Sequence, residues 1–175
     1  MTETPKILIV EDNKAHLQNA VEQLGHFVDL TTAKNFDSGL DALRDGKFTF
    51  MLTDLMMPKG TSRTMGDRGM EMIFEEMPYG FPLAFYAARK EVPIIAIVTD
   101  INHHQHPMAY SFDYIHGVHR INNSILKVGG APMMPKGDIY VKDWARALLD
   151  LREMDLKEAF PEMEFFQKLK EEYGK

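Results

Sequence analysis

The chain has 175 residues, of which 45% are hydrophobic and 26% charged, and its formal net charge at pH 7 is −6. This size predicts one domain with a substantial core. The absence of any block of Lys and Arg argues against nucleic-acid binding, and the absence of cysteine excludes disulfide and thiolate chemistry. No apolar run approaches the roughly 18 residues of a membrane span, and residues 1–10 do not resemble a signal peptide, so we expect a cytoplasmic protein that does not bind membranes.

Short apolar runs alternate with segments of helical periodicity along most of the chain. The run KILIV at residues 6–10 is fully apolar, as in a strand that is covered on both faces. Glycines that follow the helical segments mark their ends. The predicted elements, in chain order, are a strand at 6–10, a helix with Leu17, Val21 and Leu24 on one face, a strand at 27–33, a helix capped by Asn35, strands at 48–55, 92–99 and 124–128, and a helix at 143–154.

Strands that alternate with helices predict a parallel sheet covered by helices on both faces. Right-handed crossovers leave few topologies for five such strands. We therefore predict an α/β fold of the flavodoxin-like, doubly wound type, with a five-stranded parallel sheet in the order 2-1-3-4-5.

Two segments exceed this plan. The segment at about 59–78 is long for a strand-to-helix connection, where roughly 2 to 6 residues are usual, and is predicted as an insertion with a short helix near 70–76. Residues 157–175 follow the last predicted helix and carry an apolar stripe around Phe166. We expect a domain over residues 1–156 and a C-terminal helical extension that covers the domain's own surface, with no separate output domain.

Acidic residues follow the predicted strands where ligands bind in open parallel sheets, beyond the carboxyl ends of the strands. Glu11 and Asp12 follow the first strand and Asp54 ends the third, and these two strands are neighbours in the predicted order. Carboxylates this close repel one another, and a hard divalent cation such as Mg²⁺ relieves that repulsion. A carboxylate in such a pocket can act as a nucleophile toward phosphorus, and Thr99, one strand over, is placed to donate its hydroxyl to the product.

Three motifs resemble the receiver domains of two-component response regulators. They are KILIVEDN at 6–13, LTDLMMP at 52–58 and IIAIVT at 94–99, and they occur in the order that the family has. The resemblance covers most of residues 5–154, interrupted by the insertion. Each motif alone is weak, but the three together make a specific pattern.

The resemblance implies a function and a set of site residues. Asp54 is expected to accept a phosphoryl group from a histidine kinase or phosphotransfer protein. Glu11, Asp12, Asp54 and the main-chain carbonyl of Met56 are expected to bind Mg²⁺, and Thr99 to respond to phosphorylation. The family is not one of dedicated enzymes, and its members pass the signal to a downstream protein and often form homodimers.

The sequence departs from the family pattern near the end of the fifth strand. Receivers have Lys-Pro there, and the Lys contacts the phosphoryl group, whereas Ala131 holds that position here. Lys127 and Lys142 are the candidates to replace it, and Lys142 is preferred because it lies at the start of the helix predicted at 143–154, from where its side chain can reach back to the site. Val128 stands where the family has an aromatic switch residue, and Asp100 stands where a small residue follows the Thr.

These departures leave two other functions open. One is a pseudo-receiver that never takes a phosphoryl group and acts as a protein-interaction module. The other is a metal-dependent phosphohydrolase that uses Asp54 with His103 or His104, although the D-x-D pair of one such enzyme class is missing. We interpret His103, His104 and His106 as solvated residues in the first turn of a helix capped by Asp100 or Asn102, rather than as a metal site.

Overall fold

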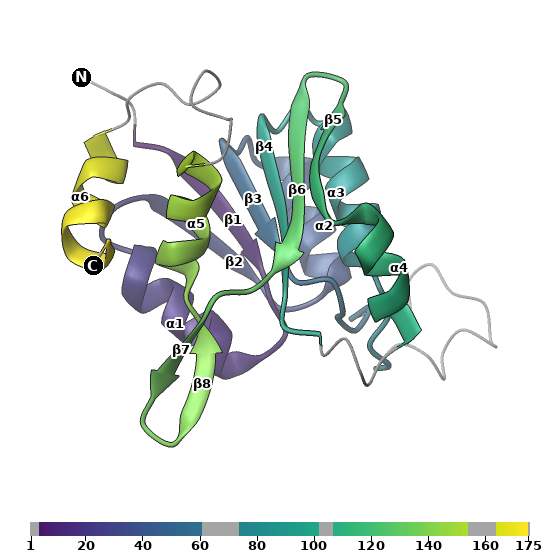
Figure 1. Cartoon of the computed structure of the whole chain (residues 1–175). Helices are drawn as coiled ribbons and strands as arrows, with labels where there is room; N and C mark the ends of the chain where they lie inside the picture. The colour runs from purple at the N-terminus through teal and green to yellow at the C-terminus, as the bar shows by residue number, and fades with distance from the viewer. Residues whose placement is uncertain (1–3, 61–73, 102–106, 154–163, 175) are drawn as a thin grey trace.

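The computed structural model describes residues 4–60, 74–101, 107–153 and 164–174. A central sheet runs through the molecule with helices on both of its faces (Figure 1). The sheet has six strands in the order β2-β1-β3-β4-β6-β5. These strands are β1 (Lys6–Val10), β2 (Asp29–Ala33), β3 (Phe50–Thr53), β4 (Ile94–Thr99), β5 (Gly117–Ile121) and β6 (Ser124–Gly130).

Five neighbouring strands, β2, β1, β3, β4 and β6, pair in parallel. This is the order that the sequence predicts, with β6 as the predicted fifth strand. The predicted fold class is therefore confirmed. The sequence pattern does not predict β5, which pairs antiparallel with β6 at the edge of the sheet. Most of this strand is exposed and it carries His119 and Arg120, so it lacks an apolar run.

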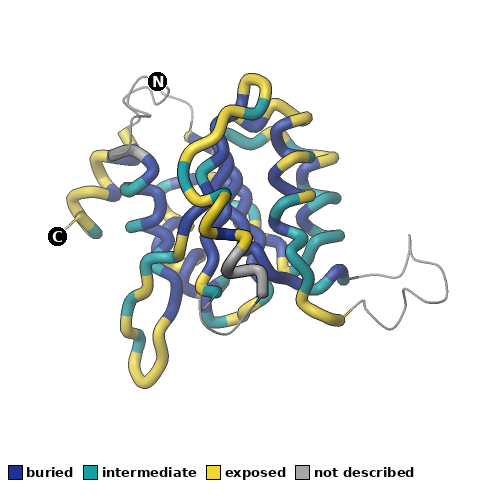
Figure 2. The backbone as a smooth tube through the Cα atoms, turned by 45° about the vertical axis from the view of Figure 1, so that its right-hand side comes forward, coloured by how far each residue is buried: buried dark blue, intermediate teal, exposed yellow. Residues whose placement is uncertain are grey.

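Helices form a layer on each face of the sheet. Alternate residues of a strand point to opposite faces, so Ile7 and Ile9 enter one core while Leu8 and Val10 enter the other. The buried central strands stand out as dark blue segments in Figure 2. The helices are α1 (Lys14–Leu24), α5 (Trp144–Glu153) and α6 (Glu164–Tyr173) on the first face, and α2 (Phe36–Asp45), α3 (Gly80–Arg89) and α4 (Pro107–Ile115) on the second.

The C-terminal extension contributes to the same core as the rest of the first face. Helix α6 buries Phe165, Phe166 and Leu169 there. The rings of Phe165 and Phe166 each lie 6.0 Å from the ring of Phe50 in β3, in edge-to-face geometry. Aromatic pairs in this arrangement add to the free energy gained from burial.

Main-chain hydrogen bonds fix the residues at both ends of the insertion after β3. Met57 and Met77 form an isolated antiparallel bridge, with N–H to carbonyl distances of 3.1 Å in both directions. The carbonyl of Pro58 accepts a hydrogen bond from Phe36 at the start of α2. Most of the short helix predicted near 70–76 lies outside the described residues.

Helix α1 buries a face that is more polar than the sequence predicts. Val21, expected on the buried stripe, is 49% exposed, so this part of the prediction was wrong. The buried residues of the helix are His16, Asn19, Ala20, Gln23 and Leu24. The reason is a hairpin that the sequence pattern does not predict, β7 (Met133–Lys136) and β8 (Ile139–Lys142), which forms a separate two-stranded sheet. The hairpin and the start of α5 lie against α1 and present main-chain groups that need partners.

Within the described part of the chain, we find no helix with the length and apolar character needed to cross a membrane.

Candidate functional site

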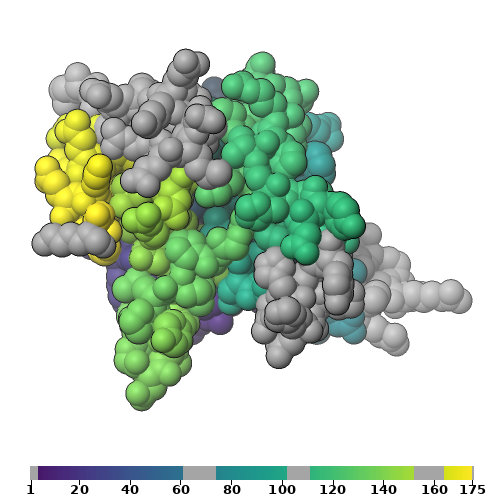
Figure 3. All heavy atoms as spheres, viewed as in Figure 1, coloured from purple at the N-terminus to yellow at the C-terminus, as the bar shows by residue number. Residues whose placement is uncertain are grey.

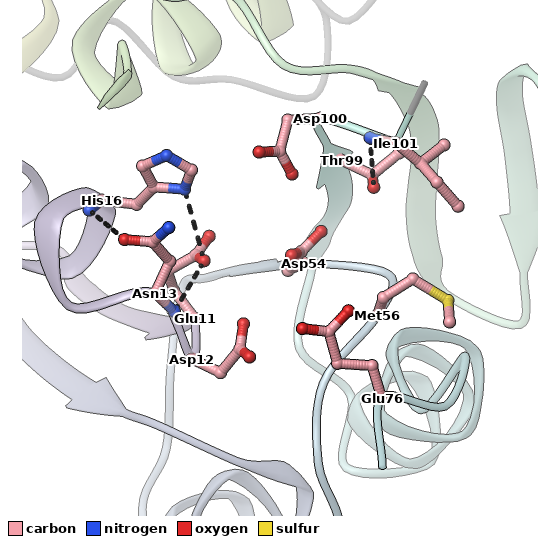
Figure 4. A pocket seen from close by; sticks show the side chains of 10 residues that line it. All are labelled: Glu11, Asp12, Asn13, His16, Asp54, Met56, Glu76, Thr99, Asp100 and Ile101. Carbon is pink, nitrogen blue, oxygen red and sulfur yellow. Dashed lines mark hydrogen bonds and ion pairs between the residues drawn. The ribbon is translucent and has the colours of Figure 1, made fainter. Parts of the chain in front are cut away.

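The ends of β1, β3 and β4 open on one pocket with a volume of about 290 Å³. In Figure 4 the carboxylates of Asp12, Asp54, Glu76 and Asp100 point toward a common space. The site therefore brings together acidic residues from three strand ends and from the insertion. The lining residues are Glu11, Asp12, Asn13, His16, Asp54, Met56, Glu76, Thr99, Asp100 and Ile101.

The sheet register brings the predicted metal ligands together. Val10 pairs with Thr53, so Glu11 and Asp54 both follow that register position at the same edge of the sheet. Glu11, Asp12 and Asp54 each offer a carboxylate oxygen, and these oxygens lie within 4.8 Å of one another. The three acids are thus close enough to share one ion.

Lys142 supplies a buried positive charge to this cluster. Its ammonium nitrogen Nζ lies 2.7 Å from Oε2 of Glu11, 3.1 Å from Oδ2 of Asp54 and 3.5 Å from Oδ1 of Asp100. Lys142 is the last residue of β8, whereas the sequence placed it at the start of the last helix. Burial alone would lower the pKa of Lys142, but the three carboxylates outweigh burial and raise it, so Lys142 stays charged.

The other residues considered for this role lie elsewhere. Ala131, where the family has its Lys, directly follows β6 and donates its N–H to the carbonyl of Thr99 at 2.7 Å. Lys127 lies within β6 and interacts with Asp150 of α5, and burial lowers its pKa. The structure therefore brings Lys142, rather than Lys127, to the carboxylates.

Asp54 is buried but not sealed, since it is 6% exposed and lines the pocket. Its Oδ1 accepts a hydrogen bond of 2.6 Å from the N–H of Leu55. Burial raises the pKa of Asp54 to about 7, against the opposing effect of Lys142 and with further contributions from Glu11 and Asp100. Near neutral pH the carboxyl group is therefore close to its midpoint of ionisation.

Glu11 is fully buried, and both of its oxygens have partners. Besides the contact with Lys142, Oε1 accepts a hydrogen bond of 3.1 Å from the N–H of Asn13 and lies 3.5 Å from Nδ1 of His16. Burial would lower the pKa of His16, but Glu11 outweighs it and raises that pKa. His16 was not predicted as a site residue; the available signal was its place in the first turn of the helix that follows Glu11 and Asp12.

Asp12, Glu76 and Asp100 complete the negative lining. Burial raises the pKa of Asp12, and the nearby charges of Glu11 and Glu76 raise it further. The sequence analysis missed Glu76 because it lies in the insertion, where no periodicity places it. Asp100 faces Lys142, and the cap expected at Asp100 or Asn102 stays a prediction, because residues 102–106 before α4 lie outside the described residues.

The chemistry of the lining fits a divalent cation that prefers oxygen ligands. Five carboxylates line the pocket, and the buried ammonium of Lys142 compensates only part of their charge. Glu11 and Asp54 are buried whereas Glu76 and Asp100 are exposed, but acids gathered this closely repel one another, and a divalent cation relieves that repulsion. Met56 lines the pocket beside these acids, and metal binding by its main-chain carbonyl stays a prediction.

Thr99 occupies the position expected for it, at the end of β4 and at the edge of the pocket. It is buried, and its hydroxyl oxygen accepts a hydrogen bond of 3.3 Å from the N–H of Ile101. Val128, where an aromatic residue was expected by resemblance, is buried in the core beneath α2, α3 and α4. The histidines of 103–106 lie outside the described residues.

Comparison with known proteins supports the fold assignment. No family model and no curated protein matches the chain. Among solved structures, the signal receiver domain of an HD domain-containing protein from Pseudomonas fluorescens Pf-5 is similar, with a TM-score of 0.53, 15% identity, and coverage of 86% of this chain and 94% of that one. A CheY-like response regulator receiver domain protein from Methanospirillum hungatei JF-1 has a TM-score of 0.51, 17% identity, and coverage of 97% and 99%. The chain thus has the fold of receiver domains.

Proposed function

We propose that this protein is a stand-alone response-regulator receiver that takes a phosphoryl group on Asp54 from a histidine kinase or phosphotransfer protein in the cytoplasm. The observation that carries the proposal is the contact of the buried Lys142 with Glu11 and Asp54, two of the acids that line the pocket. A receiver site needs an acceptor carboxylate, acids for a metal ion and a cation for the phosphoryl group. Residues of all three kinds lie together here, although the cation comes from an unexpected place in the chain.

The proposed reaction is nucleophilic substitution at phosphorus. A carboxylate oxygen of Asp54 forms a bond to phosphorus while the bond from phosphorus to the donor imidazole nitrogen breaks, and the imidazole leaves with the bonding electron pair. The product is an acyl phosphate on Asp54. With its pKa near 7, a substantial fraction of Asp54 is ionised at neutral pH and available as the nucleophile.

The remaining residues stabilise the transferred group. Lys142 is placed to move its ammonium from the Asp54 carboxylate to a phosphoryl oxygen, and Thr99 is placed to donate its hydroxyl. Mg²⁺, when bound, would neutralise charge on the phosphoryl oxygens, held by Asp12, Asp54, Glu11 and the main-chain carbonyl of Met56. Phosphorylation adds a charge of about −1.5 to −2, which would alter the surface read by a downstream protein or a second copy of the chain.

Intact mass measurement after incubation with acetyl phosphate and MgCl₂ tests this function. We expect one phosphoryl mass on the wild-type protein and none on Asp54→Asn. Asp41→Asn, an exposed acid of α2, is the matched control and should still be modified. Absence of the phosphoryl mass with acetyl phosphate, and also with a phosphorylated histidine phosphotransfer protein, would rule the proposal out.

A second candidate function is favoured by the crowding of acids around Asp54. Asp100 adds a charge next to Lys142, and Lys142 already contacts Asp54. These negative charges would repel an anionic phosphodonor. This repulsion favours a pseudo-receiver that binds its partner without phosphorylation. Partner affinity that is unchanged by Asp54→Asn would select this function over the first.

A further inference from the structure

The lysine that contacts two acids of the pocket lies on a hairpin outside the main sheet. Lys142 ends β8, and the β7–β8 hairpin projects from the body of the molecule beside α1 (Figures 1 and 3). Two strands alone are marginally stable in water. The exposed tip of this hairpin and its separation from the main sheet mean that other contacts have to fix Lys142 in place.

Asn19 of α1 holds the main chain of Lys142. Its side-chain Nδ2 donates a hydrogen bond of 2.9 Å to the carbonyl of Lys142, and both residues are buried. Its Oδ1 accepts a hydrogen bond from Nζ of Lys136 in β7 at 3.3 Å. One amide therefore binds both strands of the hairpin.

Gln23, one turn further along α1, holds the residues that follow Lys142. Its Oε1 accepts hydrogen bonds from the N–H groups of Trp144 at 2.8 Å and Ala145 at 3.2 Å. Its Nε2 donates to Oδ1 of Asp143 at 2.9 Å, and that oxygen also accepts from the N–H of Arg146. Gln23 thus satisfies N–H groups at the start of α5, which have no partners within that helix.

The same helix also begins at the pocket. Asn13 caps α1 through hydrogen bonds from Ala15 and His16 to its side chain, and its own N–H donates to Glu11. Helix α1 therefore fixes Glu11 at one end and the main chain of Lys142 further along. This fixes the separation of the two partners of the ion pair.

We propose that Asn19 and Gln23 are positioning residues that hold the Lys142 ammonium against Glu11 and Asp54, a role that rests on the proposed function of the pocket. A lysine side chain has several rotatable bonds, so its ammonium is placed reliably only where the main chain is fixed. Hydrogen bonds from buried amides on α1 fix the main chain of Lys142, as strand pairing fixes the main chain of a residue at the end of a sheet strand. These hydrogen bonds also explain why α1 buries Asn19 and Gln23, which lie outside its predicted apolar face.

Amine labelling read by mass spectrometry tests the positioning directly. Lys142 and Lys59 are both buried lysines in ion pairs, but Lys59 pairs with Asp37 of α2, away from the hairpin. In Asn19→Asp, which keeps the shape of the side chain and loses the donor to Lys142, we expect labelling of Lys142 to rise about tenfold while Lys59 stays protected. Equal exposure of both lysines, or continued protection of Lys142, would overturn the proposal.

Phosphorylation rates with acetyl phosphate provide the second readout. Asn19→Asp and Gln23→Leu should lower the rate constant about tenfold or more, since small misplacements of a catalytic group are costly. Glu22→Gln is a substitution on the same helix, α1. It removes the surface ion pair with Lys136 of β7 and should leave the rate unchanged. Leu43→Ala, in the opposite core, controls for lost stability, and a rate loss there equal to that of Asn19→Asp would refute positioning.

The two proposals fail in different ways. If the wild-type protein takes no phosphoryl group, the proposed function is lost, and the labelling of Lys142 still decides whether Asn19 and Gln23 position it. If the wild-type protein is modified while the Asn19 and Gln23 variants are modified equally fast and keep Lys142 protected, the function stands and the positioning role falls.

Discussion

Gly80 begins α3 directly against the main chain of Asp54. A Cβ atom at residue 80 would overlap the carbonyl oxygen of Asp54 and approach Cα of Leu55 to 2.8 Å. The N–H of Gly80 also donates to the carbonyl of Leu55 at 2.9 Å. The main chain of Asp54 is therefore packed against the start of a helix that has no room for a side chain at residue 80.

The variant Gly80→Ala should push the main chain of Asp54 out of place. We expect a loss of about 1 to 3 kcal/mol in the free energy of unfolding, as for other overpacked sites, together with slower modification by acetyl phosphate. Urea denaturation and intact mass give the two measurements. Gly130→Ala, where an added Cβ meets nothing within 4 Å, is the control, and equal losses in both variants would contradict the explanation.

Asp54 should make the folded protein less stable as pH rises from about 4 to about 7. Its pKa of about 7 in the folded state lies above the unfolded value near 3.9, so the folded state binds more protons in this window. The free energy of unfolding then falls with pH, with a contribution from this group of at most about 1.4 kcal/mol per pH unit. Asp54→Asn removes that contribution, so its stability relative to wild type should increase from pH 4 to pH 7 in urea titrations. A constant difference would show that Asp54 ionises normally.

Replacing Lys142 should leave buried carboxylates without their cation. We expect Lys142→Met to lose about 3 to 5 kcal/mol at pH 7, the range for breaking one side of a buried ion pair. The loss should shrink at pH 5, because the pKa values of the remaining acids rise and protonation relieves their repulsion. Lys136→Met, in the exposed part of the same hairpin, should cost much less. Equal losses at both pH values would argue that packing, rather than charge, dominates at Lys142.

Mg²⁺ should stabilise the protein through the acids of the pocket. Binding to the folded state alone adds about 2.7 kcal/mol when the ion is at a hundred times its dissociation constant. Differential scanning fluorimetry with increasing MgCl₂ should show a rise in Tm that is smaller in Asp12→Asn. Asp41→Asn should respond like the wild type, and an Asp12→Asn response of full size would remove Asp12 from the ligand set.

How far the fold follows from the sequence depends on burial. Strands β1, β3 and β4 are covered on both faces and appear as continuous apolar runs, so their order was predictable. The exposed edge strand β5 and the hairpin lack such runs and were missed. The apolar pattern identifies strands that are buried in the core. It does not identify exposed strands that are held in place by hydrogen bonds to neighbouring elements.

The site shows the same division. Glu11, Asp12, Asp54 and Thr99 were found because each directly follows or ends a predicted strand. Lys142 emerged from the sequence only as a substitute for a missing residue, since nothing local indicates that β8 points it at Glu11. The sequence pattern does not indicate that Asn19 and Gln23 are buried, because their hydrogen-bond partners lie more than 100 residues away in the chain.

The bond between Lys142 and Glu11 joins residues 131 positions apart. The pairing of β1 with β3 places Glu11 beside Asp54, and the ammonium that both acids contact comes from the later part of the chain. Closing so long a loop costs entropy, and without Lys142 the repulsion between these acids would oppose the pairing of the central strands. The last third of the chain therefore does more than cover a finished sheet: its arrival makes the pairing of the first strands electrostatically favourable, which ties the two ends of the sequence into one cooperative unit.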